Sequence, residues 1–188
     1  SHKQCGGAGP LLDGLRKCLD IPASEAANDC TVQIGEDRVR FVSSEASFAN
    51  TRRGRVNYRN NAELLARCLA REEIQFWQEH PDDFRSIKSI YIDGHTDCQG
   101  NPFNNASLGF KRAKVLLEMY RKEIKKQAKR EGLTMGEQRE LERKVNVRSF
   151  GENLPTKGSA CLVKDNQKVP ADRRVTVSVE QQVSGGPG

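Results

Sequence analysis

The sequence lacks the features that define several large protein classes. No apolar run approaches the roughly 20 residues that a membrane-spanning helix needs, and no signal peptide is visible. Aromatic residues make up 6% of the chain, and none alternates with basic residues on an expected strand, as a platform for nucleic-acid bases requires. These residues therefore contain no transmembrane helix, and the basic charge has no accompanying base-stacking surface.

Signatures of catalysis and of zinc binding are also missing. Neither GxSxG nor HExxH occurs, and no histidine accompanies a candidate serine or cysteine nucleophile. The six cysteines, at positions 5, 18, 30, 68, 98 and 161, form no CxxC pair and match no zinc template. We therefore expect a protein that is not an enzyme and that binds neither a metal nor a cofactor.

The composition is that of a well-solvated single domain. The 188 residues are 36% hydrophobic and 30% charged, which suits one core with extensions. The net charge of +6 makes anionic partners possible, and residues 111–130 alone hold nine lysines and arginines. A solvated helix face explains that stretch most simply, and binding of a polyanion such as nucleic acid is the alternative. The even number of cysteines favours disulfides outside the cytoplasm over buried thiols in a cytosolic protein.

Hydrophobic periodicity predicts alternating strands and helices. Residues 31–42 alternate as a strand pair or one bent strand, and residues 86–94, 145–151 and 173–181 are further strands. Helices are expected at 61–79, at 107–131, and from the Thr134–Glu137 capping box to Lys144. The helix at 107–131 should end at Gly132, and its apolar stripe is formed by Ala113, Leu116, Tyr120 and Ile124. The order is β–α–β–α–β–β. It predicts an α/β (α+β) two-layer sandwich in which helices cover a mixed sheet.

One stretch, "DGHTDCQGNPF" at 93–103, concentrates polar side chains after an expected strand. This position places Asp97 just past the carboxyl end of the strand and Arg112 about one turn into the next helix, at the rim where α/β sheets bind ligands. Asn105, Leu108 and Arg112 are spaced to share one helix face. A carboxylate and a guanidinium together match a zwitterionic amino-acid end.

Two other interpretations of this stretch remain open at this point. In the first, Asp97 and Arg112 simply pair with each other at the surface, which their chemistry alone allows equally well. A metal site would use His95, Asp97 and Cys98, but the set falls short of the four ligands that zinc prefers.

Three motifs in order resemble one family. "GHTDCQGNPFNNASLGFKRAKV" at 94–115, "SFGENLP" at 149–155 and "DRRVTV" at 172–177 are similar to the signature of OmpA-like peptidoglycan-binding domains. That family includes the C-terminal domains of outer-membrane porins, the peptidoglycan-associated lipoprotein and MotB-type stator subunits. The resemblance covers about residues 31–182 and implies an OmpA-like fold with a lengthened second helix, because residues 124–144 are an insertion with no assigned role.

The resemblance implies a ligand and a role for each motif residue. The family grips the diaminopimelate of the peptidoglycan stem peptide; by the motif, Asp97 holds its ammonium and Arg112 its carboxylate. Asn105 and Leu108 lie beside the pocket, and Arg173 lines its rim. The departures are Gly109 for serine, Asp172 for asparagine, and Cys98 within the binding loop.

The resemblance also implies a setting for the domain. We expect a periplasmic domain of a membrane-anchored protein, in which residues 1–30 are a cysteine-containing lead-in that starts with a tag scar and residues 183–188 are a linker or tag remnant. The expected role is to anchor a stator-like complex, of the MotB type or of a phage-defence motor, as a homodimer with a membrane-embedded partner. An outer-membrane lipoprotein or porin tether is the alternative within the class.

The cysteine pairing is an expectation from the same resemblance. The loops that carry Cys98 and Cys161 are neighbours in the family, so we expect a disulfide between them across the mouth of the site. Cys18–Cys30 is a first assignment among the remaining four cysteines, since six cysteines allow 15 pairings.

Overall fold

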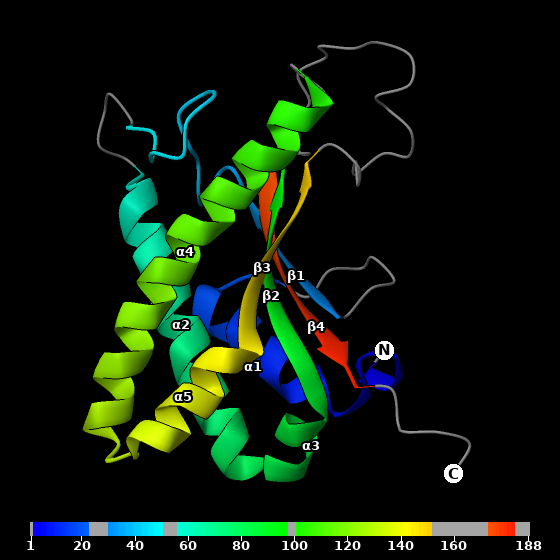
Figure 1. Cartoon of the computed structure of the whole chain (residues 1–188), viewed down its shortest axis with the longest axis vertical. Helices are drawn as coiled ribbons and strands as arrows, with labels where there is room; N and C mark the ends of the chain where they lie inside the picture. Colours follow the sequence, from blue (N-terminus) through cyan, green and yellow to red (C-terminus); the bar gives the residue numbers. More distant parts are fainter. Residues whose placement is uncertain (1, 23–29, 51–55, 98–100, 152–172, 183–188) are drawn as a thin grey trace.

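The computed structural model of the chain describes residues 2–22, 30–50, 56–97, 101–151 and 173–182 (Figure 1). The elements in chain order are the 3-10 helix η1 (His2–Ala8), α1 (Gly9–Leu19), β1 (Thr31–Gly35), α2 (Tyr58–Glu79), α3 (Pro81–Ser86), β2 (Ile87–His95), α4 (Pro102–Arg130), α5 (Met135–Lys144), β3 (Val145–Gly151) and β4 (Arg174–Gln181). Within these residues, no helix combines the length and the apolar character that crossing a membrane requires.

The strands form a single mixed sheet in the order β1-β4-β2-β3. β4 is antiparallel to both of its neighbours, and β2 and β3 are parallel. The connection from β2 to β3 runs through α4 and α5, which makes a β–α–β crossover. The predicted order of elements and the predicted mixed sheet are confirmed.

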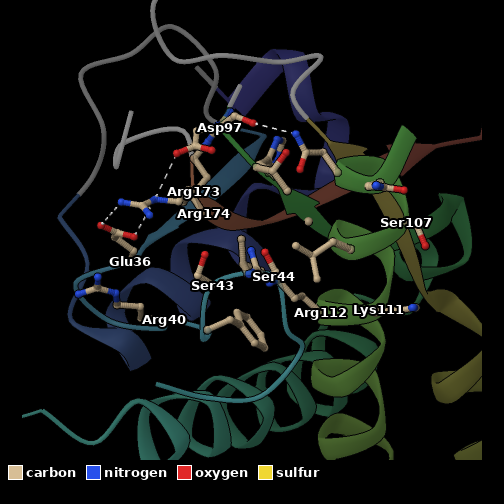
Figure 2. Close-up of a pocket in the computed structure, with 18 of the residues that line it drawn as sticks. Glu36, Arg40, Ser43, Ser44, Asp97, Ser107, Lys111, Arg112, Arg173 and Arg174 are labelled. Atoms are coloured by element: carbon tan, nitrogen blue, oxygen red, sulfur yellow. Dashed lines mark hydrogen bonds and ion pairs between the residues drawn. The ribbon is translucent and has the colours of Figure 1, made fainter. Parts of the chain in front are cut away.

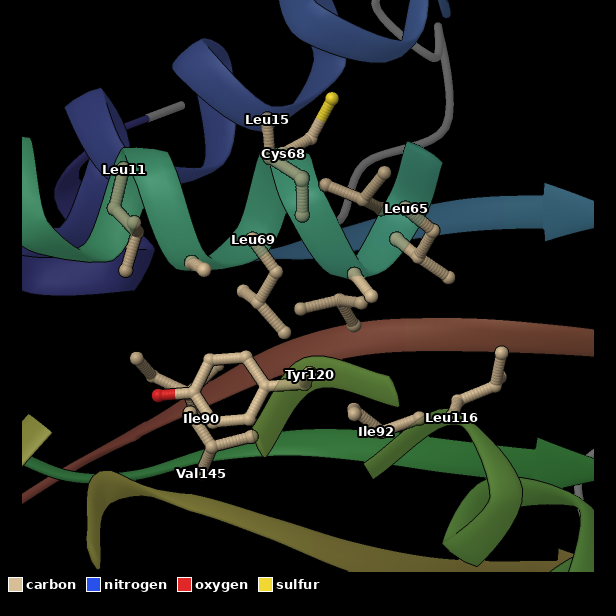
Figure 3. Packing of buried hydrophobic residues seen from close by; sticks show 14 of the residues in the cluster. Leu11, Leu15, Leu65, Cys68, Leu69, Ile90, Ile92, Leu116, Tyr120 and Val145 are labelled. Carbon is tan, nitrogen blue, oxygen red and sulfur yellow. The ribbon is translucent and has the colours of Figure 1, made fainter. Parts of the chain in front are cut away.

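Helices α2 and α4 lie side by side on one side of the sheet (Figure 1). Buried side chains of these two helices pack against the apolar side of β2 (Figure 3). They are Leu69 of α2 and Leu116 and Tyr120 of α4, which meet Ile90 and Ile92 of β2. The stripe predicted for the second helix, Ala113 to Ile124, is buried as expected. This packing is the two-layer sandwich that the sequence predicts.

Local capping explains where the long helix α4 begins and ends. It begins at Pro102, before the expected residue 107, because the Asn101 side chain accepts a hydrogen bond from the Phe103 N–H at 2.8 Å and Pro102 suits the first turn. Gly132 ends it with φ of 71°, and the Leu133 N–H donates to the Ala128 carbonyl at 2.9 Å. The predicted capping box of Thr134 and Glu137 is present in α5.

The strand expected over residues 31–42 is shorter than predicted. β1 ends at Gly35, because the Gly35 carbonyl accepts hydrogen bonds from the N–H groups of Arg38 and Val39, both at 3.1 Å, and turns the chain. Phe41 then makes an isolated bridge with Phe48 and stacks on its ring at 5.0 Å between centroids. The result is a loop over residues 36–50 that folds back toward α4.

The lead-in contributes to the same core. Leu11, Leu12 and Leu15 of α1 are buried with the residues of α2 and β1. Disulfides join Cys5 to Cys30 and Cys18 to Cys68, with Cα–Cα distances of 5.1 Å and 5.9 Å. The expected Cys18–Cys30 bond is therefore wrong: α1 packs against α2, and this docking brings Cys18 to Cys68 on the buried face of α2.

Candidate functional site

Two glycines set the geometry of the site by letting α4 approach β2. A Cβ atom on Gly94 would collide with the backbone carbonyl of Gly109, and one on Gly109 would collide with the Ser149 hydroxyl. Gly109 is the position where the resembling family carries serine, so glycine here accompanies a close contact between the helix and two strands. This contact fixes the first three turns of α4 beside the end of β2.

Asp97 follows β2 and is 4% exposed. Its backbone carbonyl accepts a hydrogen bond from the Asn105 side chain at 3.3 Å, which ties the loop after β2 to α4. Its carboxylate faces Arg173, whose Nε lies 3.6 Å from Asp97 Oδ2. Arg173 is also paired with Glu36, with distances of 3.2 Å and 3.3 Å between their atoms. Figure 2 shows Arg173 between the two carboxylates.

Arg112 projects from α4 and holds the loop after β1. Its Nε donates to the Glu45 carbonyl at 2.9 Å and its Nη2 donates to the Val42 carbonyl at 3.0 Å. Its guanidinium also lies over the Phe41 ring, 5.2 Å from the centroid. One edge of the guanidinium, formed by Nε and Nη2, therefore braces this loop.

The loop that Arg112 holds contains a tight turn. The Glu45 N–H donates to the Val42 carbonyl at 3.0 Å, and Ser44 has φ of 63°. A positive φ at the third residue of a four-residue turn is typical of type II turns, in which glycine is preferred. The turn places Ser43 and Ser44 at the wall of the pocket.

A cavity of about 550 Å³ brings these groups together. All the site residues that the sequence predicts line it: Asp97, Asn105, Leu108, Arg112 and Arg173. The prediction placed Arg112 about one turn into its helix, but it lies about three turns from the N-terminus because α4 begins at Pro102. Asp97 makes an ion pair with Arg173, and its charge also acts on Arg112.

The cavity is mostly cationic. Arg40, Lys111 and Arg174 line it together with Arg112 and Arg173, against the carboxylates of Glu36 and Asp97. Burial and the nearby charge of Arg173 together lower the pKa of Arg112 to about 10, although the charge of Asp97 opposes the change. Arg112 therefore remains protonated at neutral pH. The site can accept an ammonium at one position while it offers several guanidinium groups to carboxylates.

Sequence reasoning missed Glu36 and the Ser43–Ser44 turn. Glu36 lies in the segment that was predicted to be strand, the two serines follow directly after that segment, and none of the three belongs to a motif. The signal for the turn was weak, because serine is a poor indicator of a positive φ compared with glycine or asparagine. The contact of Glu36 with Arg173 depends on strand pairing across more than a hundred positions of sequence.

His95 is held inside the fold. Its Nε2 lies 2.9 Å from the Thr176 hydroxyl, and its ring stacks on Phe150 at 5.3 Å between centroids. Over the described ranges, no three side chains of His, Cys, Asp or Glu are grouped so as to hold a metal ion. Cys98 and Cys161, the expected disulfide pair, lie outside the residues that the structure describes.

No family model and no curated protein matches the sequence. Among solved structures, the chain is similar to the peptidoglycan-associated lipoprotein from Burkholderia pseudomallei, with 18% identity and a TM-score of 0.41 over 87% of this chain and 99% of that one. It is also similar to the OmpA-like domain of FopA1 from Francisella tularensis subsp. tularensis SCHU S4, with 14% identity and a TM-score of 0.40 over 81% and 75% of the two chains. Both structures are of the OmpA-like type that the sequence motifs resemble.

Proposed function

We propose that the protein binds peptidoglycan non-covalently through the diaminopimelate of the stem peptide. The observation that carries this proposal is that the motif residues predicted from the sequence line one cationic cavity, with Asp97 and Arg112 both in its wall. A diaminopimelate end has one ammonium and one carboxylate, so it matches one carboxylate and one guanidinium. Binding of this ligand anchors the domain to the cell wall.

Each residue has a defined task in this binding. Asp97 accepts hydrogen bonds from the ligand ammonium, and Asn105 fixes the backbone that carries Asp97. Arg112 donates to the ligand carboxylate from its Nη1 end, since its Nε and Nη2 already hold the turn. Leu108 supplies an apolar wall for the methylene chain, and Arg173 serves a further carboxylate of the stem.

The proposed activity is binding without catalysis, metal or cofactor. Among the described residues that line the cavity, Arg173 pairs with Glu36 and Asp97, and Arg112 donates to backbone carbonyls, which suits these groups to binding. We expect binding to survive chelation of divalent metals.

We further propose that the domain works in the periplasm as part of a membrane-anchored complex. The two disulfides support an oxidising compartment. A homodimeric stator subunit with a membrane-embedded partner, of the MotB type or of a phage-defence motor, is the preferred assembly. A lipoprotein or porin tether is the alternative.

Co-sedimentation with purified sacculi tests the proposal. The wild-type protein is expected to pellet with sacculi, and added diaminopimelate is expected to release it. The matched competitor is cadaverine, which keeps both amines and the five-carbon chain between them but has no carboxylate, and which should not release the protein. Failure to pellet, or release by cadaverine as readily as by diaminopimelate, contradicts the proposal.

A second candidate function, binding of a polyanion such as nucleic acid, has one observation in its favour. The outer face of α4 carries exposed basic side chains, among them Lys114, Lys122, Lys125 and Lys129. Such binding would weaken steeply with salt. If binding of nucleic acid is a separate activity, the double variant Lys122→Glu with Lys125→Glu should lose retention on duplex DNA at low salt and keep sacculus binding. If the wild type is not retained on duplex DNA, this candidate function is wrong.

A further inference from the structure

Three charged side chains form a row at one end of the cavity: Glu36, Arg173 and Asp97 (Figure 2). Arg173 Nε lies 3.2 Å from Glu36 Oε2 and 3.6 Å from Asp97 Oδ2, and Arg173 Nη2 lies 3.3 Å from Glu36 Oε1. Arg173 therefore meets Glu36 through two closer contacts and Asp97 through one longer contact. The side chains are 22%, 28% and 6% exposed for Glu36, Arg173 and Asp97, so solvent screens these charges only in part.

The sheet itself fixes this row. In the antiparallel pairing of β1 with β4, Gly35 stands opposite Arg174, so the next residues outward, Glu36 and Arg173, face each other. On the other side of β4, Arg174 stands opposite His95 at the end of β2, two residues before Asp97. The start of β4 thus lies between the ends of β1 and β2, and Arg173 lies between a carboxylate from each.

This arrangement bears on how a ligand ammonium reaches Asp97. In the proposed function, the ammonium takes Asp97 as its partner and competes there with Arg173. Because Glu36 already holds Arg173 by two contacts, Arg173 keeps a carboxylate partner when the ammonium arrives. Without Glu36, Asp97 would be the remaining carboxylate among the described residues that line the cavity. Arg173 would then lose its carboxylate partner whenever a ligand ammonium bound Asp97.

We propose that Glu36 makes the pocket selective for ligands that carry an ammonium as well as carboxylates. It does so by holding Arg173 and by offsetting the repulsion between Arg173 and the ammonium. Glu36 is a positioning residue, since it acts through Arg173. This inference rests on the proposed function, because it assumes that Asp97 receives the ammonium of diaminopimelate.

Titration calorimetry with two small molecules tests the inference. The probes are diaminopimelate and pimelate, which has the same chain and both carboxylates but no amine. The wild type is expected to prefer diaminopimelate. In Glu36→Gln the ratio of the two affinities should fall by roughly fivefold or more, since typical coupling between linked sites is of that size. The fall should come from weaker binding of diaminopimelate, with pimelate bound as tightly as before or tighter.

Two further variants separate selectivity from a loss of folding. Glu63→Gln breaks the Arg59–Glu63 pair on α2, 3.5 Å apart and outside the cavity lining, and should leave the ratio of affinities unchanged. Arg173→Gln removes the competing guanidinium, so adding Glu36→Gln to it should no longer change the ratio.

The outcomes distinguish this inference from the proposed function. If the wild type binds neither molecule, the proposed function is wrong, and the inference that rests on it is wrong too. If the wild type prefers diaminopimelate but Glu36→Gln has the same ratio of affinities, or changes it equally in the presence and absence of Arg173, the inference is wrong and the proposed function stands.

Discussion

The buried carboxyl groups of Asp97 and Glu73 lie in contrasting surroundings. Asp97, 4% exposed, faces the guanidinium of Arg173 at the wall of a cavity. Glu73 of α2 is fully buried between α2, α4 and α5, where it contacts the Tyr120 hydroxyl. Burial, with the nearby charge of Glu142, raises the pKa of Glu73 well above its ordinary value, although the hydrogen bond to Tyr120 opposes the rise.

Proton counting supports a neutral Glu73. The Tyr120 hydroxyl contacts Glu73 and also lies 3.3 Å from the Leu141 carbonyl, yet it has one proton to donate. If Glu73 is protonated, it donates to the Tyr120 oxygen, and the hydroxyl donates to Leu141. The neighbouring group therefore determines the role of each buried carboxyl. A cation at the wall of a cavity suits Asp97 to ligand binding, whereas a phenol in a closed core suits Glu73 to holding helices together.

The largest effect is expected at the carboxyl beside the cavity. Asp97→Ala and Arg112→Ala should each remove most sacculus binding, because loss of one charged partner in a desolvated site costs about 2–5 kcal/mol. Co-sedimentation measures the effect, and thermal unfolding checks the fold. Asp82→Ala and Arg139→Ala, at exposed positions of α3 and α5, are the matched controls. Wild-type sedimentation of both pocket variants would show that the site is assigned wrongly.

The second prediction concerns the expected disulfide between Cys98 and Cys161, next to Asp97 in the sequence. A Cys98–Cys161 bond would close a loop of about 64 residues, for which chain entropy gives about 4 kcal/mol of stability, less any strain. Cys98→Ser with Cys161→Ser should therefore lower the unfolding temperature and loosen the loop that carries Asp97. Peptide mapping without reduction decides the pairing: a 98–161 crosslinked peptide supports it, and alkylation of Cys98 in the native oxidised protein rules it out.

The buried carboxyl of Glu73 should make the stability of the fold depend on pH. The folded-state pKa of Glu73 is raised, so its stabilising contribution is complete below the unfolded value of about 4.3 and is lost as the pH rises toward the folded value. Over that window the free energy of unfolding should fall by about 1.4 kcal/mol per pH unit from this group. Urea unfolding across pH should show that Glu73→Gln removes this slope, while Glu79→Gln, exposed at the end of α2, keeps it. An identical slope in wild type and Glu73→Gln would mean that Glu73 is charged in the fold.

The smallest effect concerns the turn beside the cavity. Ser44 has φ of 63°, a conformation that glycine adopts without a steric cost. Ser44→Gly should raise the free energy of unfolding by roughly 0.5 kcal/mol, after the gain is offset by the freer unfolded chain. Ser47→Gly, at a neighbouring position without a positive φ, should lower it. A lower urea midpoint for Ser44→Gly would show that the turn is not strained.

Most of the fold could be predicted from the sequence, because local interactions determine most of the helices and strands. The apolar stripe of α4, the capping box at Thr134 and Glu137 and the stop at Gly132 are all within-helix signals, and each is confirmed. The five site residues were identifiable because they follow a motif, and they meet because the end of β2 and the face of α4 share one rim.

The remaining features depend on contacts between distant segments. Cys18 pairs with Cys68 because α1 docks on α2, which no spacing of cysteines encodes. Glu36 meets Arg173 because β1 pairs with β4 in one register, and a shift of one residue would point Glu36 to the other face. The truncation of β1 at Gly35 is likewise a consequence of the turn that follows it.

The most direct test of the central claim, that Asp97 and Arg112 hold the two ends of a zwitterion, is a crystal structure of the protein with bound diaminopimelate. The account predicts the ligand ammonium within hydrogen-bond distance of the Asp97 carboxylate and the carboxylate on the Nη1 end of Arg112. The Arg112 contacts to Val42 and Glu45 should persist, and Arg173 should remain on Glu36. Diaminopimelate bound away from this cavity, or bound with its carboxylate toward Asp97, would contradict the account.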